Sequence, residues 1–198
     1  MKRLSIVVFL LWSVTVSAEN NTNVIFETEL GAIEIELFVD QAPASTESVL
    51  KLVDQGLYDG EGFYRVVRPD NDNGNPVISV IQGGVLDPLE AQAVELVEHE
   101  TTDRTGIKHL DGVVSLARTG ASGSGATFFI CIGDQSSLDF GGARNADGQG
   151  FAAFGRVTSG MDVVRSVNRL TETRADPNPY VQNQILLNPI KIIRAYRK

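Results

Sequence analysis

The sequence predicts a mainly β protein that folds as one domain over residues 19–198, with about eight short strands and two helices. The chain has 198 residues, which is enough to bury a sizeable core. Its 19 glycines indicate many turns and close backbone contacts, which suit a β architecture better than a helical bundle. Short apolar runs recur at regular spacing between turn residues, as is typical of a sandwich or a barrel. Composition alone leaves these two architectures open.

A signal peptide is predicted over residues 1–18. Lys2 and Arg3 form a basic start, residues 4–16 are almost wholly apolar, and Ala18 ends a small-residue cleavage site. The apolar run is short for a bilayer span, so an uncleaved membrane anchor is the less favoured alternative. We therefore expect a periplasmic or secreted protein that has no membrane contact after cleavage.

The mature chain is predicted to open with strands over 24–28 and 32–37. The second strand alternates apolar and acidic residues, so one of its faces should be buried and the other wet. A helix should follow from Pro43 to about Gln55, because proline suits the first helical turn and Gly56 suits a stop.

Most of the remaining elements are expected to be short strands separated by turns. Further strands are predicted over 63–67, 77–82, 113–118, 127–132 and 151–157. Residues 89–101 are ambiguous between a short helix and extended chain. A second helix is predicted over 161–170, and a closing strand pair, interrupted by Pro189, over 185–196. Stretches rich in Gly, Asp or Asn predict loops over 69–76, 120–125 and 139–150.

Charge and cysteine content exclude some classes of function. The formal net charge is −8, and removal of Lys2 and Arg3 changes it to −10. Binding of nucleic acid needs clustered Lys and Arg, so nucleic acid is not an expected partner. Cys131 is the only cysteine, which rules out an intrachain disulfide and predicts a buried thiol in its apolar run. His99 and His109 lack the spacing partners of a metal site.

Two blocks carry the clearest functional signal. The first block, over 62–67, places Arg65 on a predicted strand, and the next strand ends in the Gln-Gly-Gly triplet at 82–84. The second block, over 123–131, contains Phe129. In this order the blocks resemble the signature of the cyclophilins, the cyclosporin-sensitive class of peptidyl-prolyl isomerases.

The resemblance covers about residues 24–170 and implies a fold and an activity. The implied fold is a closed eight-stranded antiparallel β-barrel with one helix capping each end. The implied activity is cis-trans isomerisation of X-Pro bonds, with no cofactor and no metal. The implied partners are proline-containing peptides and unfolded proteins, and we expect the protein to be a monomer.

The chemistry explains why an arginine suits this reaction. Rotation about the X-Pro bond crosses a barrier of roughly 18–20 kcal/mol, and in the twisted state the proline nitrogen regains a lone pair. Arginine offers a permanently charged, rigid fork of donors to that nitrogen. Arg65 is the candidate donor, although a lone arginine on a strand is more often an ordinary surface residue. The resemblance implies that Gln82 orients it and that Phe129 lines the proline pocket.

Further candidate substrate contacts match other positions of the family. They are Ser79, Val80, Ala117, Arg118, Thr127, Leu138 and Phe151. Several depart from the usual family residues, and Ser137 stands where sensitive relatives carry a tryptophan, which predicts weak cyclosporin binding. These changes leave open an alternative function as a weakly catalytic or non-catalytic module that binds proline-containing chains.

One loop is longer than the family pattern. Arg65 and Gln82 are separated by extra residues that fall in the predicted loop 69–76. The Asp, Asn, Gly and Pro of this stretch offer little to bury, so we expect it to be exposed and mobile beside the substrate groove.

Overall fold

The computed structural model describes residues 21–118 and 120–198. The predicted signal peptide lies outside the described residues. Within them, no helix is both long enough and apolar enough to cross a lipid bilayer.

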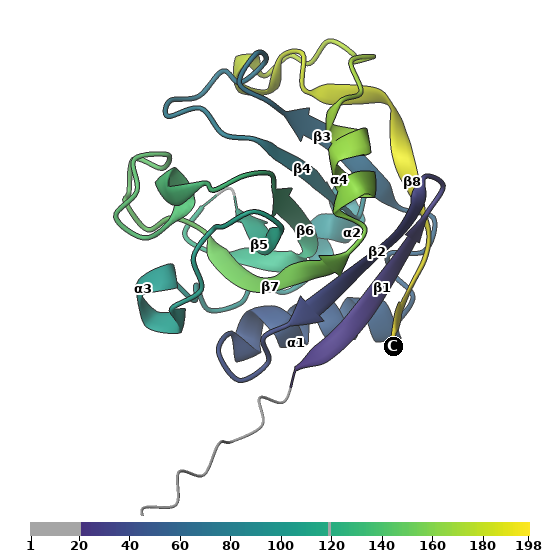
Figure 1. Ribbon diagram of the computed structural model, residues 1–198, viewed down its shortest axis with the longest axis vertical. Helices are drawn as coiled ribbons and strands as arrows, with labels where there is room; N and C mark the ends of the chain where they lie inside the picture. Colours follow the sequence, from purple (N-terminus) through teal and green to yellow (C-terminus); the bar gives the residue numbers. More distant parts are fainter. Residues whose placement is uncertain (1–20, 119) are drawn as a thin grey trace, which may run out of the picture.

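The strands form a closed antiparallel barrel with the order β1-β2-β7-β5-β6-β4-β3-β8 (Figure 1). This confirms the eight-stranded barrel that the family resemblance implied. The strands are β1 Thr22–Thr28, β2 Gly31–Leu37, β3 Gly62–Val67, β4 Val80–Gly84, β5 Val113–Arg118, β6 Gly123–Cys131, β7 Ala152–Ser159 and β8 Ile185–Arg197.

The interior of the barrel is an apolar core built by strand alternation. In β2 every second residue is buried, as the apolar and acidic alternation predicts. Aromatic rings fill the centre, where the Phe128 ring lies 5.3 Å from that of Phe26 and 5.9 Å from that of Phe63. The Phe63 and Phe128 rings meet edge-to-face, and such a contact adds stability beyond that of the apolar area it buries.

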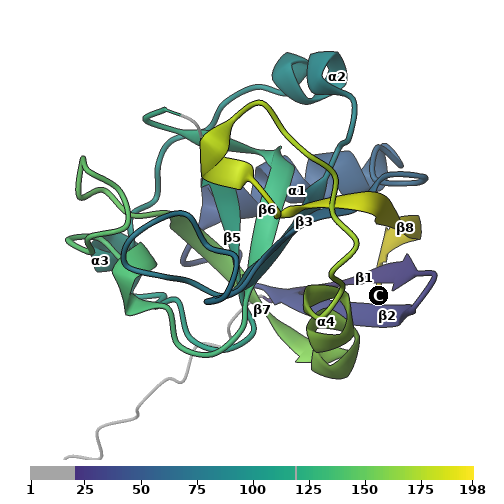
Figure 2. The ribbon, with the colours of Figure 1, turned by 90° about the horizontal axis from the view of Figure 1, so that it is seen from above.

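Two helices cover opposite sides of the barrel (Figures 1 and 2). Helix α1, Pro43–Asp54, starts with its proline in the first turn and buries Val49 and Leu52. Helix α4, Met161–Asn168, buries three valines. Both predicted helices are therefore confirmed. The shorter helices are α2 Pro88–Ala93, α3 Thr102–Thr105, η1 Ser136–Leu138 and η2 Pro179–Val181.

The predicted starts of two strands, β4 and β6, were wrong by several residues. Strand β4 begins at Val80, because Ile78 donates its N–H to the Asp72 side chain and not to a neighbouring strand. Strand β6 begins four residues earlier than expected, since Gly123 and Gly125 serve close packing and not a loop. A Cβ at Gly125 would lie 2.7 Å from Leu52 of α1.

The predicted closing strand pair is instead one long strand. The first part of β8 pairs with β3 and the second part pairs with β1, so this strand closes the barrel. Pro189 lies where the pairing with β3 shifts register, between the partners Ile185 and Ile190. A missing N–H is tolerated at such an irregularity, which is why the proline does not end the strand.

Candidate active site

A groove of about 1010 Å³ lies over β3, β4, β5 and β6. It brings together every residue that the sequence predicted for the site except Ser79. The predicted residues that line it are Arg65, Gln82, Phe129, Val80, Ala117, Arg118, Thr127, Leu138 and Phe151. Ser79 does not line the groove, because alternate residues along β4 and the extended stretch just before it face the groove, and these are Ile78, Val80 and Gln82.

A bulge in β3 places Arg65 at the groove. The pairing of β3 with both neighbouring strands shifts register between Phe63 and Arg65. Phe63 and Val66 pack in the barrel core, while Tyr64 and Arg65 are both half-buried and line the groove. A bulge commonly re-aims a side chain in this way beside an active site.

Two glutamines hold the Arg65 guanidinium. Nη1 of Arg65 donates to Oε1 of Gln82 at 3.0 Å, and Nε2 of Gln82 donates in turn to the Tyr64 hydroxyl at 2.9 Å. On the other side, Nε and Nη2 of Arg65 both donate to Oε1 of Gln184, at 2.9 and 2.7 Å. Sequence reasoning missed Gln184, which lies 119 positions from Arg65.

The charge of Arg65 is not neutralised by a carboxylate. In residues 21–118 and 120–198 no Asp or Glu lies within ion-pair distance of it. The Tyr180 ring centroid lies 5.6 Å from its guanidinium carbon. Burial lowers the pKa of Arg65 below the ordinary arginine value, and Tyr180 and Tyr64 partly offset this. Arginine nevertheless stays protonated at neutral pH, so the site holds a half-buried cation that no carboxylate of the described residues pairs with.

An apolar pocket adjoins Arg65. Val80, Phe129 and Leu138 are at most 5% exposed and belong to one buried cluster, against which Ala117 and Phe151 pack. The ring of Phe129 meets that of Phe151 edge-to-face at 5.2 Å. Ile78 also lines this pocket and was missed by sequence reasoning.

Buried polar contacts support Phe129 from behind. The His109 ring stacks on the Phe129 ring with centroids 6.0 Å apart. His109 contacts Asp139 through Nδ1 at 2.8 Å and Ser115 through Nε2 at 3.1 Å. The histidine is therefore satisfied inside the protein, and no group of three or more metal-ligating side chains occurs in the described parts of the chain.

Arg118 forms one wall of the groove. Its guanidinium makes two bonds of 2.8 Å to Asp147 and lies 5.5 Å from the centroid of the Phe151 ring. The hydrogen bonds from Arg118 lower the pKa of Asp147 to about 2. Arg118 is thus a paired cation that supports Phe151. Thr127 lines the same groove two residues before Phe129.

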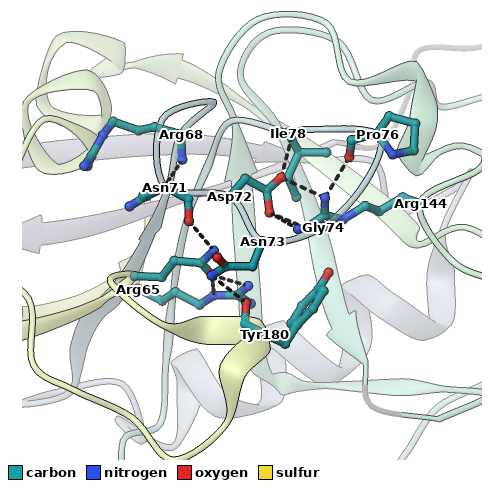
Figure 3. A network of polar contacts seen from close by, with 11 residues as sticks. Arg65, Arg68, Asn71, Asp72, Asn73, Gly74, Pro76, Ile78, Arg144 and Tyr180 are labelled. Carbon is teal, nitrogen blue, oxygen red and sulfur yellow. Dashed lines mark hydrogen bonds and ion pairs between the residues drawn. The ribbon is translucent and has the colours of Figure 1, made fainter.

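The loop after β3 is anchored, and the expectation that it offers little to bury was wrong at Asp72. The Asp72 side chain is 0% exposed and forms bonds of 2.7 and 2.8 Å to Arg144, which is itself 2% exposed (Figure 3). Asp72 also accepts the backbone N–H groups of Gly74 and Ile78. Burial opposes ionisation of Asp72, but these bonds outweigh it and keep its pKa below the ordinary aspartate value.

Comparison with known proteins gives a consistent result. The family model for cyclophilin type peptidyl-prolyl cis-trans isomerase/CLD matches residues 23–196. The chain is 30% identical over 180 residues to peptidyl-prolyl cis-trans isomerase A of Dickeya dadantii, covering 90% of this chain and 88% of the relative. It is 33% identical over 153 residues to peptidyl-prolyl cis-trans isomerase B of Escherichia coli, covering 77% and 87%.

Solved structures show the same fold. A cyclophilin type peptidyl-prolyl cis-trans isomerase of Cryptosporidium parvum superposes with a TM-score of 0.64 at 20% identity, over 90% of this chain and 98% of the other. A second structure of that protein, described as in the presence of dipeptide Ala-Pro, gives a TM-score of 0.63 at 19% identity, over 89% and 98%.

Proposed function

The chain belongs to the cyclophilin-type peptidyl-prolyl cis-trans isomerases, which isomerise X-Pro bonds, and we propose that Arg65 is its catalytic residue. The observation that carries this proposal is the pairing of an uncompensated guanidinium with an apolar pocket in one groove. Amide oxygens orient the guanidinium, and no carboxylate competes for its charge in the described part of the chain. A polarising donor of this kind stabilises the twisted amide more than the planar one, which is the requirement for catalysis.

In the proposed mechanism, the proline ring of the substrate enters the pocket of Val80, Phe129 and Leu138. This pocket fixes the ring while the residue before proline rotates. Three of the five N–H groups of Arg65 donate to Gln82 and Gln184. One N–H on each terminal nitrogen is left for the substrate. As the amide twists, such a donor bonds the lone pair that develops on the proline nitrogen. No bond breaks, so the residues need only orientation and charge.

Arg65→Ala tests this role. We expect a loss of about two orders of magnitude in kcat/KM, as when one preorganised donor worth ~2.7–4 kcal/mol is removed. Turnover should be measured on the mature chain with a protease-coupled X-Pro peptide assay, and folding by circular dichroism. Arg156→Ala is the matched control, because Arg156 is 59% exposed and pairs with Glu36 away from the groove. Wild-type turnover in a folded Arg65→Ala protein would refute the assignment.

We further propose that the substrates are proline-containing segments of unfolded proteins. Beyond the pocket, the groove runs past the exposed side chains of Leu86, Leu96 and Leu187. Such a surface suits an extended apolar chain. Refolding of a protein limited by a trans-to-cis proline step should accelerate with the wild type and not with Arg65→Ala. Acceleration by neither protein would instead support the alternative of a binding module without isomerase chemistry, and equal acceleration by both would refute the role of Arg65.

The protein is also proposed to be exported and to act as a monomer in the periplasm or outside the cell. The support is the basic, apolar and small-residue order of the first 18 residues. Expression of the full chain in a bacterium, followed by fractionation and intact mass measurement, tests this. A periplasmic product that starts at Glu19 is expected, and a full-length cytoplasmic product would overturn the proposal. The sedimentation coefficient of the mature product tests whether the protein is a monomer.

A further inference from the structure

Gln184 has every polar atom of its side chain engaged. It is 0% exposed and immediately precedes β8. Its Oε1 accepts two bonds from Arg65, and its Nε2 donates to the Asn71 carbonyl at 2.8 Å. Its backbone carbonyl accepts the N–H of Val66, which directly follows Arg65 on β3, at 2.9 Å. The side chain and the backbone of Gln184 therefore both fasten the stretch that carries the proposed catalytic residue.

We propose that Gln184 is a positioning residue for Arg65 and sets the turnover of this enzyme. The inference rests on the proposed role of Arg65. Gln82 holds only one terminal nitrogen of the guanidinium, which leaves the fork free to pivot. Gln184 binds Nε and Nη2 together and thereby fixes the plane of the fork. Because the acceptor is a neutral amide, it fixes the cation without neutralising it.

Two loops deliver Gln184 to this place, and they form one unit, the paired loops 68–77 and 171–184. Asn71 donates to the Asn183 carbonyl at 2.9 Å, and Asn73 donates to the Gln182 carbonyl at 2.9 Å. Tyr180 of the second loop lies beside Arg65, with its ring centroid 5.6 Å from the guanidinium carbon (Figure 3). The loop that is longer than the family pattern thus helps to position Gln184, because its Asn71 carbonyl orients the amide of Gln184.

Among side chains of similar size, only a neutral amide both accepts hydrogen bonds from the guanidinium and leaves its charge without a negative partner. Methionine has a similar length and apolar character but offers the guanidinium no strong acceptor, so the fork would be free to rotate. Glutamate would keep the acceptor but would place a full negative charge against Arg65. That charge would compete with the proline nitrogen for the field of the cation. Both substitutions should therefore slow the reaction, for different reasons.

The test is a double-mutant cycle of Arg65→Ala and Gln184→Met on the mature chain, with kcat and KM measured separately. Gln184→Met alone should lower kcat about 10- to 100-fold, the scale of a misplaced reacting group, with KM changed less than about 2-fold. The double variant should be no slower than Arg65→Ala, since Gln184 acts only through Arg65. Asp70→Ala is the control, because Asp70 lies in the same loop, has a side chain that is 71% exposed and pairs with Arg68, and its kcat should match the wild type.

The outcomes separate the two proposals. A fast Arg65→Ala protein would refute the roles of both residues. A slow Arg65→Ala protein combined with losses that multiply in the double variant would overturn the positioning role alone. If Gln184→Met does not fold, Gln184→Glu decides the matter, since it retains an acceptor for Arg65. Its kcat should fall while the Arg65 Nε–H resonance stays protected from exchange, and wild-type kcat in that variant would overturn the inference.

Discussion

Removal of the Asp72 carboxylate should destabilise the protein far more than its place in a polar surface loop suggests. In Asp72→Ala the Arg144 guanidinium loses its carboxylate and keeps, among the residues that the structure describes, the Pro76 carbonyl and the Tyr180 side chain as partners. Both charged groups of the pair are at most 2% exposed, so the variant leaves a buried cation unpaired. Breaking a buried pair in this way costs about 3–5 kcal/mol of unfolding free energy. For a chain of this size, that corresponds to a fall in Tm of roughly 6–20 °C.

The same loop offers a matched control. Asp70 carries the same charge and pairs with Arg68 at 3.0 Å, but its side chain is 71% exposed. Asp70→Ala should therefore cost only about 0–1 kcal/mol. Urea denaturation of the wild type and both variants gives the comparison directly. If Asp72→Ala lost no more stability than Asp70→Ala, the loop would open to hydrate Arg144 at little cost, and the Asp72–Arg144 pair would not anchor it.

The pH dependence gives a second test of this pair. The pKa of Asp72 is lowered in the folded state, so the pair contributes stability at pH values above the ordinary aspartate pKa of 3.8. That contribution is lost as the pH falls through the lower pKa of the folded state. The difference in unfolding free energy between wild type and Asp72→Ala should therefore be constant near neutral pH and shrink below about pH 3.8. A difference that grows on acidification would contradict this sign.

Three further predictions follow from the groove and the core. Ser137→Trp should tighten cyclosporin binding, measured by calorimetry, because Ser137 directly precedes the pocket residue Leu138. Equal affinity of the variant and the wild type would show that Ser137 does not lie at the rim of the pocket. Cys131 is fully buried and burial raises the pKa of its thiol, so it should react with a thiol reagent at pH 8 only as fast as the protein unfolds. Asp147→Asn should release Arg118 and raise kcat/KM for peptides with an acidic residue near proline, whereas neutral peptides should be unaffected.

The parts of the fold that the sequence predicted are those specified locally. Alternation in β2 and the proline and glycine that bracket α1 act over a few residues, so their elements were found. The barrel itself came from ordered motif blocks and not from periodicity, which left a sandwich equally open. Gly123 and Gly125 were taken for a loop because sequence does not distinguish a glycine needed for flexibility from one needed for close approach.

The parts of the site that were missed depend on contacts between distant residues. The residues of the Asp72–Arg144 pair lie 72 positions apart, and Gln184 lies 119 positions from Arg65. A single aspartate in a loop and a single glutamine before a strand carry no local signal, since their meaning depends on the partner that the fold supplies. Ile78 was the one omission with a usable signal, because it shares the strand alternation of Val80 and Gln82.

The arrangement of charges explains how a polar loop can be fastened beside Arg65 without weakening it. Of the two arginines near the Tyr180 ring, the Asp72 carboxylate pairs with Arg144 and not with Arg65. On Arg65 the two members of that pair act in opposite directions, since Arg144 lowers its pKa and Asp72 raises it. The pair therefore anchors the loop as a nearly neutral unit. The loop bonds the amide of Gln184, which in turn bonds Arg65. The cation that we assign to catalysis is therefore held by a neutral group, and its charge stays available to the substrate.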